Sequence, residues 1–194
     1  MNGHHRLLSL VMASLVVLCS CSSGKTEESR IEEIRSEYSE AESLTATALV
    51  TADYGDRVYE FKLRYTGNDT EGDVEILAPE SLKGLTARIG EVGKSLIYDG
   101  AELSLGDLTP DGISPMECLP MMTACWKSGC TDGSVTEKIN GRDTLAVTYP
   151  IQENEQLITW FETDTNLPLR AELFFDGDMV ISCEFENIIT HTEK

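Results

Sequence analysis

The feature that most constrains the fold is a long series of short segments in which apolar and polar residues alternate. The clearest one, over 57–65, carries its aromatic and aliphatic side chains at every second position: Tyr59, Phe61, Leu63 and Tyr65. A period of two is typical of a β-strand with one face buried. A chain of 194 residues built mainly in this way is expected to form a single β-rich domain.

Eleven strands are expected, and two-residue turns join several of them. Asp99-Gly100, Asn140-Gly141 and Asp176-Gly177 each lie between apolar runs, which is a strong hairpin signal. The expected strands cover about 44–51, 57–65, 74–78, 85–91, 95–99, 102–106, 133–140, 143–149, 155–163, 168–176 and 179–188. Short connections make neighbouring strands antiparallel, so a meander is predicted.

Two segments have a helical period instead. Over about 29–43, apolar residues recur at spacings of three and four: Ile31, Ile34, Tyr38 and Ala41. The second helix covers about 114–128 and starts at Ser114-Pro115-Met116-Glu117, which has the form of a capping box. Gly129 is placed to end it, and Pro120 is expected to divide it into a short turn and a main segment over 120–128.

The predicted fold class is α+β, with a curved antiparallel sheet that forms an open half-barrel around the helices. One apolar face of eleven strands is more than one short helix covers unless the sheet curls. Met116, Met121, Met122 and Trp126 are therefore candidates either for plain core or for the lining of an apolar pocket. From the strands, the cavity candidates are Phe61, Leu173, Phe175 and Phe185.

The N-terminus has the plan of a secretory signal peptide. Arg6 precedes an apolar run from Leu7 to Leu18, which is too short to span a bilayer. The run ends in Leu18-Cys19-Ser20-Cys21, which resembles the lipobox of bacterial lipoproteins, so Cys21 is predicted to carry a diacylglyceryl group with acyl chains such as palmitate.

Three segments follow from this interpretation: a signal peptide over 1–20, a flexible tether over 21–30 and a domain over 31–192. The expected location is extracytoplasmic, with the lipid anchored in the cell membrane. Lipidation at Cys19 would put Leu18 where a small residue is preferred. An ordinary secreted protein cut near Ala13 or Ser20 is the remaining alternative.

Composition excludes several classes of function. A formal charge of −19 leaves no basic footprint for nucleic acid. The histidines are His4, His5 and His191, all close to the chain ends, so no core histidine can serve as a base or metal ligand. No nucleophile, phosphate-loop or dinucleotide motif is present, and no enzyme, cofactor or metal site is predicted.

Four cysteines follow the anchor: Cys118, Cys125, Cys130 and Cys183. A helix over 120–128 holds Cys118 too far from Cys130 for a disulfide, and Cys118 is likewise too far from Cys125 if the whole segment is helical. The pairs Cys125–Cys130 and Cys118–Cys183 are therefore the disulfide candidates. Four reduced cysteines remain an alternative, and the spacing matches no common zinc site.

A local motif then gives a family resemblance. The segment from Trp160 to Glu172 resembles the Trp-x-Asp-x-x-Thr-x-Leu-Pro hairpin of the lipoprotein-carrier superfamily, with Glu162 where Asp is more usual. Residues 183–188 resemble the final strand of the same superfamily, which includes the LolA and LolB carriers, LppX-type lipoproteins, the RseB sensor domain and clostridial spore-germination lipoproteins. The motif also has a purely structural explanation as a turn followed by a strand that starts at Pro168.

The resemblance implies an open half-barrel whose hollow, covered by helices, takes acyl chains in some members and serves sensing or partner binding in others. An anchor at Cys21 does not suit a soluble shuttle. The leading prediction is a membrane-anchored lipoprotein that binds a lipid or acyl ligand. The alternative is an accessory module of the cell envelope or the germination apparatus, with a filled core and a protein partner.

Overall fold

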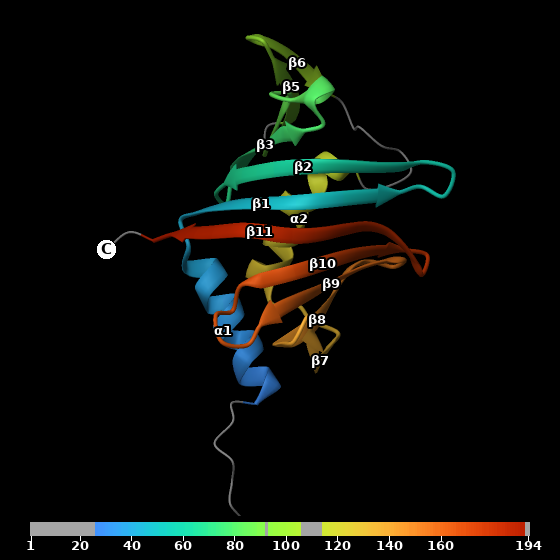
Figure 1. Ribbon diagram of the computed structural model, residues 1–194. Helices are drawn as coiled ribbons and strands as arrows, with labels where there is room; N and C mark the ends of the chain where they lie inside the picture. The colour runs from blue at the N-terminus through green and yellow to red at the C-terminus, as the bar shows by residue number, and fades with distance from the viewer. Residues whose placement is uncertain (1–25, 92, 106–113, 193–194) are drawn as a thin grey trace, which may run out of the picture.

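A computed structural model describes residues 26–91, 93–105 and 114–192. The predicted signal peptide and Cys21 lie outside the described residues. Within them, eleven strands form one antiparallel sheet in the order β6-β5-β4-β3-β2-β1-β11-β10-β9-β8-β7. The sheet is open and curved, as predicted, and both helices lie against the same face of it (Figure 1).

The sheet consists of two meanders that meet at the centre. The first comprises β1 (Ser43–Asp53), β2 (Val58–Gly67), β3 (Glu71–Ala78), β4 (Thr86–Gly90), β5 (Gly93–Tyr98) and β6 (Ala101–Leu105). The second comprises β7 (Gly133–Ile139), β8 (Arg142–Gln152), β9 (Glu155–Glu162), β10 (Pro168–Phe175) and β11 (Asp178–His191). β1 pairs with β11 and joins the two halves. A short 3₁₀ helix, η1 (Glu80–Leu82), follows β3.

The three expected hairpin turns are confirmed by their backbone angles. Both turn residues have positive φ in each: 48° and 77° at Asp99-Gly100, 51° and 82° at Asn140-Gly141, and 52° and 88° at Asp176-Gly177. Two successive positive φ values define the turn whose twist matches antiparallel strands, and Asn-Gly or Asp-Gly adopts them most readily.

The first helix, α1 (Glu27–Glu40), begins inside the range expected for the tether. Thr26 caps it by accepting a hydrogen bond from the Ser29 amide at 3.2 Å. The apolar positions expected to face the core do so, since Ile34 and Tyr38 are buried. Arg30 donates to the Thr163 carbonyl at 2.7 Å, so the turn between β9 and β10 is attached to this helix.

The second helix, α2 (Pro115–Ser128), is continuous, so the predicted division at Pro120 is wrong. A proline in the second turn removes only one intrahelical hydrogen bond, and the packing of this helix compensates for it. Ser114 is the N-cap and Gly129 ends the helix with φ 68°. The Glu117 carboxylate does not complete the capping box, because it pairs with Lys94 of β5.

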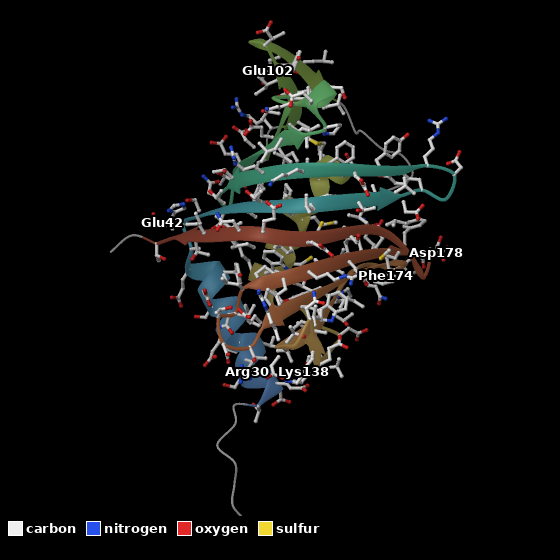
Figure 2. All side chains as sticks on the ribbon, in the orientation of Figure 1. Arg30, Glu42, Glu102, Lys138, Phe174 and Asp178 are labelled. Carbon is white, nitrogen blue, oxygen red and sulfur yellow. The ribbon has the colours of Figure 1, made fainter. Side chains whose placement is uncertain are left out.

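A bulge changes which residues of β11 face the helices. Leu173 pairs with Ile181, but Phe174 pairs with Met179, which leaves Val180 as the extra residue. Met179 therefore lies on the outer face, where Figure 2 labels its partner Phe174, although strict alternation along the strand would place it inward with Ile181. Among the described residues, no helix is long and apolar enough to cross a bilayer.

Candidate binding site

The space between the helices and the second meander is filled by an aromatic cluster of Tyr38, Trp126, Phe161 and Phe185. The Trp126 ring lies 5.2 Å from Tyr38, 5.7 Å from Phe161 and 5.6 Å from Phe185, measured between ring centroids. Tyr38, Trp126 and Phe161 are at most 1% exposed. The Trp126 indole donates to the Thr159 hydroxyl at 3.0 Å, so its one polar atom is satisfied. Core side chains therefore fill this part of the hollow.

Two buried tyrosines, Tyr38 of this cluster and Tyr149 of β8, are expected to make the fold sensitive to high pH. Burial raises the pKa of Tyr38 well above its usual range, and burial raises that of Tyr149 as well. In the unfolded chain both phenols ionise near pH ~10. Their contribution to stability is thus complete below about pH 10 and is lost as the pH rises further, by up to about 1.4 kcal/mol per unit and group.

We therefore expect the free energy of unfolding to fall steeply above about pH 10. Tyr38→Phe should make the fall shallower, because one buried phenol no longer titrates. Urea unfolding at a series of pH values, followed by circular dichroism, measures both slopes. Equal slopes for the variant and the parent would contradict the assignment to Tyr38.

The eight residues expected to line a cavity do not share one environment. Met122, Trp126 and Leu173 are fully buried. The others lie at the margins of the core: Met116, Met121, Phe61 and Phe185 are partly buried, and Phe175 is 38% exposed at the end of β10. Only Trp126 and Phe185 are joined by a ring contact, while Phe61 stacks on Tyr59 at 6.4 Å.

A crevice does exist between α2 and the first meander. Its volume is about 220 Å³, and its apolar walls are Tyr65, Ile89, Pro120 and Ala124. Gly67 and Gly72 let the Tyr65 ring lie against the backbone, because a side chain at either position would overlap that ring. The crevice is smaller than the roughly 300–1,000 Å³ of typical ligand pockets.

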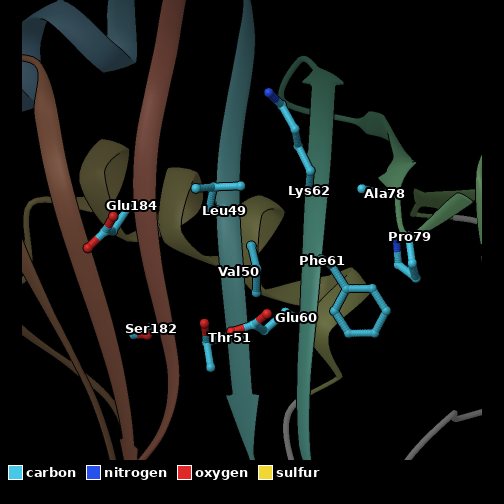
Figure 3. Close-up of a pocket in the computed structure, with 10 residues that line it drawn as sticks. All are labelled: Leu49, Val50, Thr51, Glu60, Phe61, Lys62, Ala78, Pro79, Ser182 and Glu184. Atoms are coloured by element: carbon cyan, nitrogen blue, oxygen red, sulfur yellow. The ribbon is translucent and has the colours of Figure 1, made fainter.

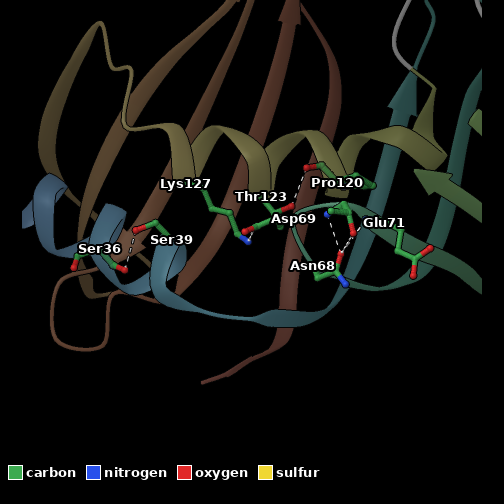
Figure 4. Close-up of polar contacts among 9 residues, drawn as sticks. Ser36, Ser39, Asn68, Asp69, Glu71, Pro120, Thr123 and Lys127 are labelled. Carbon is green, nitrogen blue, oxygen red and sulfur yellow. Dashed lines mark hydrogen bonds and ion pairs between the residues drawn. The ribbon is translucent and has the colours of Figure 1, made fainter. Parts of the chain in front are cut away.

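Polar residues close the rim of this crevice. Lys127 of α2 pairs with Asp69 in the turn between β2 and β3 (Figure 4). That turn is ordered by Asn68, whose side-chain oxygen accepts from the Thr70 and Glu71 amides at 2.9 Å each. The rim is thus held by a charge pair across helix and sheet.

A larger groove lies on the opposite, outer side of the sheet. Its volume is about 570 Å³, and it crosses β11, β1 and β2 to reach the residues that follow β3. Figure 3 shows α2 behind the sheet and Phe61 extending from β2 toward Pro79. The polar lining comes from Thr51, Glu60, Lys62, Ser182 and Glu184. Leu49 of β1 lies between Glu184 of β11 and Lys62 of β2.

The pattern of apolar and polar residues does not predict this outer groove. The available signal was the difference in length between the expected strands over 57–65 and 74–78, since the longer strand must extend past its partner. A pocket on the polar face of a sheet leaves no pattern in hydrophobicity, because its floor is made of residues that alternate like any solvent-facing set.

All four domain cysteines are free thiols, so neither predicted disulfide is present in the structure. The Cys118 and Cys183 sulfur atoms lie 3.9 Å apart, a contact that is well beyond the ~2.05 Å of a disulfide. Cys130 is exposed and Cys125 half-buried, with burial raising the pKa of Cys125 to about 11. Burial also raises the pKa of Cys183.

These environments predict the order in which the thiols react. With iodoacetamide at neutral pH and no reductant, Cys130 should be alkylated first, because only thiolates react and its thiol is exposed. Cys125 should follow slowly, and Cys118 and Cys183 only after unfolding. Peptide mass mapping after timed quenching reads each site, and an alkylation-resistant pair after unfolding would show a disulfide instead.

The described residues contain no group of three or more His, Cys, Asp or Glu side chains placed to hold a metal ion. Asp176 and Asp178, at the turn between β10 and β11, are both exposed.

No protein-family model and no curated protein sequence matches the chain. Several solved structures are similar to it. A putative outer membrane lipoprotein-sorting protein domain from Vibrio parahaemolyticus is 11% identical, with a TM-score of 0.49 over 84% of this chain and 92% of that one. A LolA superfamily protein from Nitrosomonas europaea is 11% identical, with a TM-score of 0.44 over 88% and 96%.

The Mycobacterium tuberculosis lipoprotein LppX is 14% identical, with a TM-score of 0.46 over 82% of this chain and 93% of that one. The Nitrosomonas europaea protein and LppX are of the types named in the resemblance of the Trp160–Glu172 motif.

Proposed function

We propose that the chain is a lipid-anchored extracytoplasmic protein that works as a non-enzymatic docking module of the cell envelope. The filled hollow supports this most directly, because Tyr38, Trp126 and Phe161 occupy the space that an acyl chain would need beside the second meander. What the protein offers to a partner is then the outside of its sheet, where the larger groove lies.

The proposed anchor would set the distance of the domain from the membrane. Cys21 precedes the first residue of α1, Glu27, by six positions, which an extended chain spans in about 20 Å. Glu27 accepts hydrogen bonds from Ser134 and Thr136 of β7 at 2.8 and 3.1 Å. The β7 edge would thus face the membrane, with β6 at the opposite edge of the sheet (Figure 1).

The anchor is tested by Cys21→Ala in the full chain. We expect the variant to leave the membrane fraction, because one acylated cysteine supplies the attachment. Cys19→Ala is the matched control and should stay membrane-bound. Retention of the Cys21→Ala variant in washed membranes would overturn the proposed lipidation site.

A hydrophobic ligand remains the second candidate, and the crevice beside Tyr65 and Ile89 favours it. Native mass spectrometry and solvent extraction of protein purified from its own host distinguish the two functions. No stoichiometric lipid is expected besides the anchor. A lipid that copurifies with the Cys21→Ala variant, which lacks the anchor, would replace docking by ligand binding.

A further inference from the structure

One stretch of β2 has a free edge within the described part of the sheet. β1 pairs with β2 along its whole length, from Gly67 to Val58. β3 pairs with β2 only from Gly67 to Lys62, because it ends at Ala78 and the chain turns away at Pro79. The backbone of residues 58–61 therefore has no strand partner on the side away from β1 among the described residues. Free backbone amides and carbonyls of this kind can accept another strand.

The outer groove begins at this free edge. Phe61 and Pro79 stand on either side of the gap left by β3, and Leu49, 45% exposed, forms an apolar floor on β1 (Figure 3). An extended segment that continued the line of β3 would lie between these groups. Its side chains would alternate between the groove and the far side of the sheet.

The charge of the groove selects the side chains of that segment. Glu60 lies on β2 at the free edge, and Glu184 lies on β11 two strands away. Neither carboxylate has an ion pair or hydrogen bond to the described residues. Lys62, the one cation in the groove, is neutralised by Glu186 at 2.6 Å. The groove is therefore anionic, within a chain whose formal charge is −19.

We infer that the outer groove binds an extended peptide segment of a partner protein, in which basic side chains alternate with apolar ones. The segment would pair with the free edge of β2 at residues 58–61 and place a Lys or Arg beside Glu60. This inference rests on the proposed docking function and names the chemistry of the partner. Main-chain pairing would give affinity, and Glu60 would give selectivity for basic segments.

The test uses the full chain in detergent and a short fluorescein-labelled peptide that alternates valine and lysine. Fluorescence anisotropy should show saturable binding that weakens as the salt concentration rises. A peptide that alternates valine and glutamate should not bind. Two further peptides carry N-methyl groups on every second amide, one on the odd and the other on the even positions. Only one of them should lose binding, because only one set of amides faces the free edge.

Glu60→Lys should weaken binding of the lysine peptide by about tenfold or more, and Glu184→Lys by less, because Glu184 lies farther from the edge. Glu153→Lys and Asp178→Lys are matched controls, since they make the same charge change at exposed positions outside the groove, in the β8–β9 turn and at the start of β11. Equal weakening by all four variants would show general attraction to an acidic protein and would overturn the site. If both methylated peptides bound as tightly as the parent peptide, the proposed strand pairing would be overturned.

Failure of this inference can be distinguished from failure of the proposed function. If the lysine peptide does not bind while no lipid copurifies, docking stands and this groove is not its site. If a lipid copurifies with the Cys21→Ala variant, the docking function itself fails, whatever the peptide does.

Discussion

Trp126→Ala is expected to lower the free energy of unfolding by about 3–5 kcal/mol, the range for removing a large aromatic side chain from a packed core. Trp126 is 1% exposed and is in ring contact with Tyr38, Phe161 and Phe185, which come from α1, β9 and β11. Its loss opens a cavity among all three elements and leaves the Thr159 hydroxyl without its donor. Urea unfolding followed by far-ultraviolet circular dichroism measures the change.

Trp160→Ala is the matched control, because the chain has only these two tryptophans. Trp160 lies on the outer face, where its ring is 5.8 Å from the Arg170 guanidinium and its indole donates to Glu137. A partly exposed pair of this kind contributes about 0.5–1 kcal/mol. If Trp126→Ala cost no more than Trp160→Ala, the hollow would not be packed and the ligand-binding function would regain its basis.

Much of the architecture could be predicted because its signals are local. The turn at Asn140-Gly141 depends on two residues that tolerate positive φ, and both have it. Burial of Ile34 and Tyr38 follows from helical spacing alone. The two-residue period of a strand also places Trp160 and Phe161 on opposite faces of the sheet, and Phe161 is the buried one of the two.

The errors come from choices that depend on distant partners. The Glu117 carboxylate of α2 pairs with Lys94, which lies on β5. It does not pair with the backbone at the helix start, three residues before it. Continuity of α2 through Pro120 depends on packing against the sheet. The bulge at Val180 is a one-residue difference between two strands, so it inverts the faces of Met179 without any mark in the sequence pattern.

The candidate site was harder to predict than the fold for the same reason. Large apolar residues that line a hollow and large apolar residues that fill it give identical patterns. What decides between them is the size of the residues on the facing strand. On β1, the residues that face the helices are small at three positions: Ala46, Ala48 and Ala52 are all 0% exposed. Small side chains at the centre of the sheet let α2 approach closely, which leaves no gap for a ligand between α2 and β1.

Ala48→Leu tests this close approach and should lower the free energy of unfolding by about 1–3 kcal/mol, because the added methylenes overpack a filled core. Ala48 lies between Leu63 of β2 and Phe185 of β11, so neither neighbour can yield without moving its strand. Thr47→Leu, on the outer face of the same strand, should change stability by less than about 0.5 kcal/mol. A hollow with room for an acyl chain would instead accept the larger side chain, and Ala48→Leu would then leave the urea midpoint unchanged or raise it.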